Sequence, residues 1–434
     1  MKHSKLYSAL VISLGLTLSG CGDDSSSSSS TTTTTITTTP TTITDGSVSL
    51  SFPLAFGEYS SDTIDMFGKV SSGTLASFTL VVDGVEYPTT ISGSTWRASN
   101  VSLTDSTEIE MKATKTNSVV SEKTILLTKD QLMDTDIDDF ISDIAVNEST
   151  GDIYVHSDGE FISDLHITKF NLGTGANEEL NYTKDATYGG SVRSSIATDG
   201  DNLYLSSPTA ITKIDLSTNI ETVLSDANTD VNSTVPEVIF DLGYNDISDE
   251  LYFIDLNTEE INTVNTTTGD RTNNNPSTGV QAVSVARASN GFTYYAQGQN
   301  TTGAVNIFAM TSNAPTFETI HSIDSPANGA NGGAVSDLAL NEADNELYFI
   351  DGAGDLIKLD LDTDPTAVTS STLLTGLFSV ESISGFTTPL TGLHYDTTRN
   401  VIIAAGRDAD GTNKLLVIDP VTGDYAKVAT GTVD

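Results

Sequence analysis

Residues 337–364 read DLALNEADNELYFIDGAGDLIKLDLDTD. A short apolar run is followed by a polar turn, a second run rich in aromatic residues, and a third run that ends in an acidic turn. Short runs of this kind, bounded by turn residues, predict β-strands joined as hairpins. The stretch therefore predicts three consecutive antiparallel strands.

The same pattern recurs along the C-terminal two thirds of the chain. A fourth strand, such as IETVLSD at 220–226, closes most copies. One position in the first strand is equivalent in all the repeats, and it recurs every 43 to 55 residues. The residues at this position are Asp143, Ser195, Asp241, Ser284, Asp337 and Gly392. Four strands at this period are typical of propeller blades. The sequence predicts a six-bladed β-propeller over residues 141–434.

A separate all-β region is predicted at residues 46–128. VVDGVEY at 81–87 places an Asp–Gly turn between strand-like flanks, and alternating runs such as TEIEMKATK follow it. The succession of short strands resembles bacterial Ig-like domains, which usually act as spacers, and Trp96 is predicted to lie in the core. The predicted fold class is all-β, a small Ig-like β-sandwich followed by the propeller, with an acidic linker at 129–140.

LYFID, at 251–255 and 347–351, resembles the second-strand motif of YWTD propellers, and the wider pattern also resembles NHL and gluconolactonase-type propellers. The first resemblance implies that Asp255 and Asp351 are structural. It also favours inter-blade packing for Tyr252 and Tyr348. Gluconolactonase-type enzymes hold a divalent metal in the axial channel with Glu, Asn and Asp. This chain has no recognisable Glu at the first-blade position, and a symmetric set of Asp residues departs from that pattern.

The N-terminus has the features of an export signal. A basic head precedes an apolar stretch, residues 6–18, which is too short to span a bilayer. Residues 18–21, LSGC, resemble a bacterial lipobox, which implies removal of residues 1–20 and lipidation of Cys21. Gly22, in place of Asp, favours sorting to the outer membrane. The Ser- and Thr-rich segment up to residue 45 cannot bury enough apolar surface to fold, so residues 21–45 are predicted to be a lipidated tether.

Composition narrows the possible partners. The formal net charge is −40, with 59 acidic and 19 basic residues. Such a chain would repel nucleic acid and anionic membrane surfaces, so membrane contact is predicted through the lipid anchor only. Cys21 is the single cysteine, which excludes an intramolecular disulfide. The chain also lacks the GxSxG, P-loop and HExxH motifs.

Three carboxylates form the most specific candidate site. Asp143, Asp241 and Asp337 occupy the repeated position in the first, third and fifth blades, whose innermost strands surround the axis. Carboxylates that approach one another bind a cation, share a proton or accept hydrogen bonds from nearby donors. One hypothesis is a site for Ca²⁺ or another divalent cation, and the alternative is that each Asp accepts backbone N–H groups of its own or the next blade.

A second candidate site lies on long loops between the blades and between second and third strands. Its aromatic residues could stack on sugars or form apolar pockets for a peptide, or could tuck under their own loops. These residues are Phe161, Tyr188, Phe378 and Phe386.

The features together predict an outer-membrane-anchored lipoprotein of the bacterial cell envelope. Its propeller is expected to act as a non-enzymatic binding or scaffold module for a glycan, a protein or an envelope partner. The alternative is a metal-dependent, lactonase-like hydrolase that uses the carboxylates near the propeller axis.

Overall fold

The structure is a computed structural model, and the region that it describes consists of residues 48–70, 75–115, 120–129, 132–133, 137, 140–158, 165–184, 195–207, 209–226, 239–255, 260–273, 282–289, 291–297, 305–311, 317–323, 335, 337–361, 368–378, 382–383, 386–387, 391–408 and 410–432. Every regular element in this region is a β-strand, which confirms the predicted all-β class. Within the same residues, no helix has the length and apolarity needed to cross a bilayer.

The N-terminal region contains two small sheets. One has the order β2-β6-β5, and the other begins with β1 and continues through β8, β7, β3 and β4. Its strands are β1 (Phe56–Tyr59), β2 (Thr63–Lys69), β3 (Leu75–Val82), β4 (Val85–Tyr87), β5 (Thr90–Ser92), β6 (Thr95–Ser102), β7 (Ser106–Lys115) and β8 (Val120–Lys129). Asp83 and Gly84 both have positive φ in the turn between β3 and β4, as the predicted Asp–Gly hairpin requires.

Both N-terminal sheets contribute to one hydrophobic core. Trp96 is 1% exposed and packs on Phe78 with ring centroids 5.0 Å apart, so its predicted core position is confirmed. Leu80, Ile109 and Leu127 of the larger sheet are fully buried in the same cluster. We call residues 48–129 the N-terminal module below.

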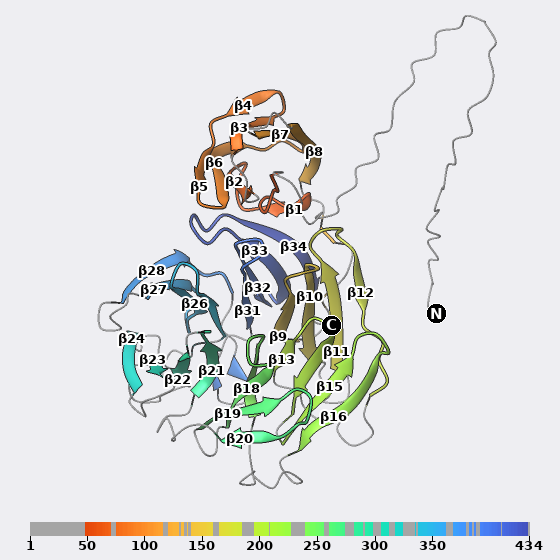
Figure 1. Ribbon diagram of the computed structural model, residues 1–434, viewed down its shortest axis with the longest axis vertical. Helices are drawn as coiled ribbons and strands as arrows, with labels where there is room; N and C mark the ends of the chain where they lie inside the picture. Colours follow the sequence, from red (N-terminus) through yellow and green to blue (C-terminus); the bar gives the residue numbers. More distant parts are fainter. Residues whose placement is uncertain are drawn as a thin grey trace, which may run out of the picture. The chain divides into compact units, whose positions relative to one another are not determined.

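The rest of the chain forms four-stranded antiparallel sheets, in which each strand pairs with the next along the chain (Figure 1). The first three are β9 (Phe140–Asn147), β10 (Asp152–Asp158), β11 (Leu165–Asn171), β12 (Asn177–Glu179); β13 (Ile196–Thr198), β14 (Asn202–Ser206), β15 (Ala210–Asp215), β16 (Ile220–Asp226); and β17 (Ile239–Asn245), β18 (Glu250–Asp255), β19 (Glu260–Asn265), β20 (Arg271–Asn273).

Three further sheets follow in the same arrangement. They are β21 (Ala282–Arg287), β22 (Phe292–Gln297), β23 (Val305–Thr311), β24 (Phe317–Ile323); β25 (Leu338–Asn341), β26 (Glu346–Ile350), β27 (Leu356–Asp360), β28 (Thr369–Leu374); and β31 (Thr391–Asp396), β32 (Val401–Arg407), β33 (Thr412–Ile418), β34 (Tyr425–Thr432). A short hairpin of β29 (Ser382–Ile383) and β30 (Phe386–Thr387) lies between the last two sheets in the chain.

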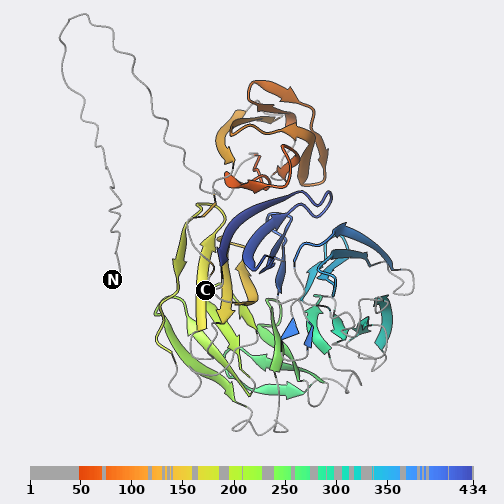
Figure 2. The ribbon, with the colours of Figure 1, turned by 180° about the vertical axis from the view of Figure 1, so that it is seen from behind.

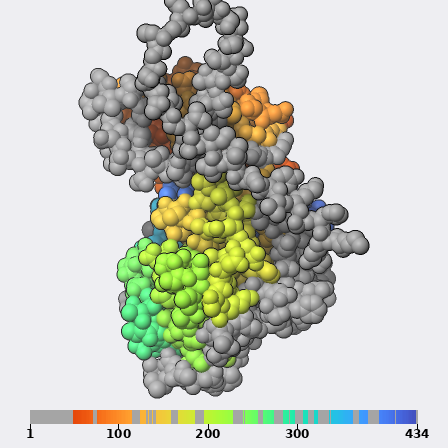
Figure 3. All heavy atoms as spheres, turned by 90° about the vertical axis from the view of Figure 1, so that its right-hand side faces the viewer, coloured from red at the N-terminus to blue at the C-terminus, as the bar shows by residue number. Residues whose placement is uncertain are grey.

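The six sheets form a closed ring of blades. Their innermost strands contact one another in the cyclic order β9, β13, β17, β21, β25, β31 and back to β9. Figure 2 shows this ring from behind, and Figure 3 shows the neighbouring outer surfaces of the first two blades in yellow and yellow-green. The described chain therefore contains a six-bladed β-propeller.

Tyrosines of the repeats pack between blades. Tyr348 of β26 is fully buried and stacks on Tyr395 of the sixth blade, with centroids 5.7 Å apart. Tyr204 of the second blade stacks on Tyr244 of the third at 6.4 Å. In the fifth blade, Asp351 Oδ1 accepts the amides of Ala353 and Asp355 and so caps the turn after β26. These contacts give Tyr348 and Asp351 structural positions.

The last blade is built from the C-terminal repeat, and its outer strand β34 pairs with β1 of the N-terminal module. The pairing is antiparallel, with Glu58 opposite Lys427 and Tyr59 opposite Ala426. The sheet therefore continues from the sixth blade into the module as nine strands. β1 lies beside Ala426 and Lys427 of β34, while the amides of Met133 and Ile137 donate to carbonyls farther along the same strand.

Candidate functional site

The repeated position places a side-chain oxygen between neighbouring blades. In five blades this oxygen accepts the N–H of the residue that follows the equivalent position in the next blade. We call this hydrogen bond the interblade latch. The N···O distances are 2.9 Å for Ile196 to Asp143, 3.2 Å for Leu242 to Ser195, 2.7 Å for Val285 to Asp241, 3.0 Å for Leu338 to Ser284 and 2.9 Å for Leu393 to Asp337.

The three aspartates make a second amide contact as well. The other carboxylate oxygen of each aspartate accepts the N–H of the next residue in the chain. These donors are Ile144, Leu242 and Leu338, at 2.7 to 2.8 Å. All six carboxylate oxygens therefore accept a backbone N–H. This arrangement is the alternative that the sequence left open, in which repeat-borne acids bind amides of their own and the next blade.

Serine hydroxyls lie between the carboxylates. Ser195 Oγ is 2.5 Å from Asp143 Oδ2 and 3.3 Å from Asp241 Oδ1. Ser284 Oγ is 3.1 Å from Asp337 Oδ1, and Ser284 also acts to lower the pKa of Asp241. Asp and Ser thus alternate around the axis as a connected polar chain.

The proximity of the carboxylates changes their titration. Burial and the neighbouring Asp241 raise the pKa of Asp143 to about 7, although hydrogen bonds from Ser195 and two amides act in the opposite direction. Burial, Asp143 and Asp241 raise the pKa of Asp337 well above its usual value. Burial also raises the pKa of Asp241. The structure therefore brings the three predicted residues together as one interacting group.

The arrangement fits a divalent cation poorly. Oxygen ligands bind Ca²⁺ through lone pairs that face the ion, and here every carboxylate oxygen uses one lone pair to accept an amide. Among the described residues, no group of three or more His, Cys, Asp or Glu side chains is placed to hold a metal ion. The hydrogen bonds favour the latch, and cation binding by these residues stays a prediction.

A cavity of about 930 Å³ extends along the axis from these carboxylates. Its walls are the innermost strands, and it opens among the turns that join first and second strands. Eight carboxylates and one arginine are among the described residues that line it. The acidic residues at the mouth are Glu148, Asp199, Asp201, Asp246 and Glu342. The cavity is therefore strongly negative, and it would repel an anionic ligand.

Glu148 and His394 form a polar cluster on the cavity wall where the first and sixth blades meet. Glu148 Oε1 lies 3.2 Å from His394 Nε2, and its Oε2 accepts the Thr398 amide at 3.2 Å and the Thr397 hydroxyl. Burial alone would raise the pKa of Glu148, but His394 and Thr397 outweigh it and lower the pKa to about 2. Glu148 is therefore ionised at neutral pH.

The predicted aromatic site is only partly within the described residues. Phe378 is 3% exposed and packs in a core cluster with Leu377, Leu393 and Tyr395, so it offers no exposed stacking surface. Phe386 lies in β30. Phe161, Tyr188 and the lipidation residue Cys21 lie outside the described residues.

Sequence reasoning missed the residues of the turns between first and second strands. Glu148, His394 and Asp199 do not share a common motif, and turn acids in so acidic a chain have no distinguishing pattern. The one available signal was positional, because Glu148 and Asp199 directly follow a first strand of the repeat and His394 lies within one.

No family model matches this chain, and no curated protein matches it. Solved structures that resemble it include a periplasmic gluconolactonase from Pseudomonas aeruginosa, with 12% identity, 82% of this chain and 97% of that chain covered, and a TM-score of 0.41. A protein from Lactobacillus plantarum has 12% identity, 82% and 97% coverage, and a TM-score of 0.46. The WD40 repeats of RRP9 have 11% identity, 70% and 83% coverage, and a TM-score of 0.44.

These neighbours include gluconolactonase-like and WD40 propellers, in line with part of the predicted resemblance. At such identities and TM-scores they carry no argument about activity. The propeller assignment rests on the sheets of this chain and on their cyclic contacts.

Proposed function

We propose that this chain is a lipid-anchored protein of the bacterial cell envelope whose propeller binds a partner without catalysis. The observation that carries the proposal is the open axial cavity, which is large enough for several side chains of a partner or for a small ligand. The lipobox-like residues 18–21 and the Ser- and Thr-rich tether support the anchoring.

The charge of the cavity defines the kind of group that fits it. The five acidic side chains at the mouth, with one arginine in the lining, favour an ammonium or guanidinium group and disfavour phosphate or carboxylate. Ile247, which is 69% exposed in the turn between β17 and β18, adds an apolar contact beside the mouth. Among the partners that the sequence allowed, a protein with a basic, partly apolar loop fits these features best.

A peptide-binding experiment tests the cavity. The wild-type protein should bind a fluorescent nonapeptide of alternating Arg and Leu, with an affinity that weakens as salt rises. Glu342→Arg should lower that affinity at least tenfold, because it places a cation at the mouth. Glu110→Arg makes the same charge change on the exposed surface of β7 and should bind like wild type. Equal binding by both variants would show attraction to the overall charge alone and would contradict the cavity.

The anchor has its own test. Wild-type protein expressed with its signal should be retained in the outer-membrane fraction, and its processing should stop with globomycin. Cys21→Ala should remain unprocessed or be released from the membrane. A mature protein that stays soluble with Cys21 intact would contradict the lipid anchor.

The alternative, a metal-dependent lactonase, would use axial carboxylates whose oxygens already accept backbone amides. Elemental analysis of the purified protein, together with lactonase and esterase assays, checks this directly. A stoichiometric divalent metal with turnover that is lost in Asp241→Asn would favour the hydrolase over the binding module.

A further inference from the structure

The junction between the sixth and first blades differs from the other five. Gly392 occupies the repeated position there, so this position supplies no side-chain oxygen to the first blade. A Cβ atom at Gly392 would lie 2.5 Å from the Ile144 nitrogen and 2.9 Å from the Asp143 carbonyl carbon, which leaves no room for Asp or Ser. The ring therefore closes without an interblade latch at this junction.

The described strands also give this junction no exchanged strand. The first blade takes β9 to β12 from one continuous part of the chain, and the sixth takes β31 to β34 from the C-terminal repeat. Among the described strands, neither of these two blades therefore contains a strand from the opposite end of the chain that would tie the ring closed. The contacts between the two ends of the ring include the Glu148 cluster at the cavity wall, where Arg399 Nη1 also donates to the Glu148 carbonyl at 3.0 Å, and the contacts of the N-terminal module described next.

The N-terminal module binds the sixth blade through strand pairing and through an ion pair. β1 extends the sheet beyond β34, and the Ser60 amide donates to the Tyr425 carbonyl at 2.9 Å. Arg97 of β6 binds Asp419 of the turn between β33 and β34 through two hydrogen bonds of 2.5 and 2.9 Å. The Asp419 side chain is fully buried, so this pair is shielded from solvent on one side.

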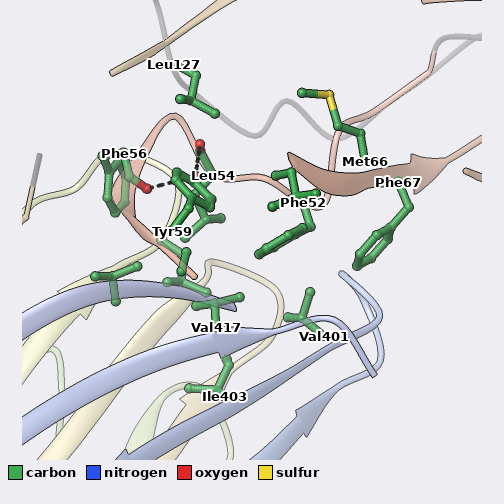
Figure 4. Close-up of a cluster of buried hydrophobic side chains, with 14 of the residues drawn as sticks. Phe52, Leu54, Phe56, Tyr59, Met66, Phe67, Leu127, Val401, Ile403 and Val417 are labelled. Atoms are coloured by element: carbon green, nitrogen blue, oxygen red, sulfur yellow. Dashed lines mark hydrogen bonds between the residues drawn. The ribbon is translucent and has the colours of Figure 1, made fainter. Parts of the chain in front are cut away.

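The module reaches the first blade as well. Phe56 packs over Gly175 in the turn between β11 and β12, where an added Cβ would lie 3.3 Å from the ring. Gly175 has φ of 70°, a conformation that glycine tolerates best. One buried hydrophobic cluster contains Phe52 and Phe56 of the module, Ile153 and Phe170 of the first blade, and Val417 of the sixth. Figure 4 shows the module's aromatic side chains facing Val401, Ile403 and Val417.

The segment between the module and the propeller follows the same edge. The amides of Met133 and Ile137 donate to the carbonyls of Val428 and Thr430 in β34, and Asn413 Nδ2 donates to the Ile137 carbonyl at 2.6 Å. Val428 and Ile137 are both buried in the shared cluster. Module and linker thus cover β34 along its length.

We propose that the N-terminal module is the closure element of the propeller: it spans the junction between the sixth and first blades and replaces the missing latch and strand exchange. It acts through a hydrophobic core that both blades share and through the Arg97–Asp419 pair. This role differs from that of a spacer, which would leave the ring equally closed if the contacts were lost.

Native-state hydrogen exchange on the full chain tests the proposal. Arg97→Gln should accelerate exchange of the β9 and β31 amides at least about tenfold, while the amides of β17 and β21, at a latched junction, stay within about twofold of wild type. Phe56→Ala removes a different contact of the module, the one with Gly175 of the first blade. It should accelerate amide exchange in the same strands as Arg97→Gln.

Lys358→Gln is the matched control. Lys358 pairs with Glu346 inside the fifth blade at 2.6 Å and has a side-chain exposure of 21%, close to the 22% of Arg97. The Lys358→Gln variant should leave the amide exchange rates of β9 and β31 unchanged. Faster exchange in the module alone after Arg97→Gln, or equal acceleration at all junctions, would overturn the proposal.

Discussion

The junction between the fifth and sixth blades and the junction between the sixth and first blades use the same repeat position in opposite ways. At the first of these, Asp337 crosses to the next blade and accepts the Leu393 amide at 2.9 Å. At the second, Gly392 lets the Ile144 backbone approach so closely that no side chain fits. One junction has a latch at the axis. The other has the Glu148–His394 contact at the cavity wall and, at its outer edge, the module that we propose as the closure element.

Introducing a latch at the unlatched junction should have the largest effect. Gly392→Asp places a Cβ 2.5 Å from the Ile144 nitrogen, and the backbone can yield only by separating β9 from β31. We expect a loss of about 3 kcal/mol or more in the free energy of unfolding, measured by urea denaturation. Val421→Asp, at a 65% exposed turn position, is the control and should be close to neutral. A Gly392→Asp protein as stable as wild type would show that the junction has space for a latch.

The latched junctions should make stability depend on pH. A carboxyl whose pKa is raised on folding stabilises the protein below its unfolded pKa, near 4, and that stability is lost as pH rises through the folded value. For Asp143, the folded value is about 7. We therefore expect unfolding free energy to fall by about 2–3 kcal/mol between pH 5 and pH 8, and Asp143→Asn to remove much of this decline.

Asp199→Asn is the control for this pH series. Hydrogen bonds from Tyr204 and Asn202 lower the pKa of Asp199 despite its partial burial, so its titration lies below the window from pH 5 to pH 8. The free energy of unfolding of this variant should therefore change with pH as steeply as that of the wild-type protein. Parallel slopes for Asp143→Asn and wild type would contradict the interaction among the axial carboxylates.

A smaller effect is expected at the turns of the unlatched junction. Glu148→Gln weakens the acceptor for His394, Thr397 and Thr398, and should cost about 1 kcal/mol at pH 7. Because the pKa of Glu148 is lowered to about 2 on folding, its ionised form stabilises the protein above its unfolded pKa. The difference between the two proteins should shrink as pH falls from 5 to 2, and a constant difference would assign the effect to packing.

The smallest effect is expected from aromatic stacking at the latched junction. Tyr348 and Tyr395 lie parallel within 4°, with centroids 5.7 Å apart. A double-mutant cycle of Tyr348→Leu and Tyr395→Leu should give a coupling energy of about 0.5–1 kcal/mol. Additive effects would show that the two rings contribute by burial alone.

Much of the propeller was predictable because local patterns determine it. Alternating apolar runs and turn residues set the strands, and the recurrence of Asp143, Asp241 and Asp337 in register placed them around one axis. The hydrogen-bond partners of these aspartates could be identified only in the folded ring, because the amides of Ile196, Val285 and Leu393 belong to the next blade. The choice between a cation site and amide acceptors depends on those partners, which no single repeat contains.

The sequence by itself determined the all-β class, the six repeats, the strong negative charge and the position of the single cysteine, because these depend on residue type and local spacing. Only the tertiary structure decided that Phe378 is buried, that Glu148 meets His394 at the cavity wall, and that Arg97 binds Asp419. Arg97 and Asp419 are separated by 322 residues, and neither belongs to a motif. Such contacts depend on where the ring closes, and ring closure is a property of the whole chain rather than of any local segment.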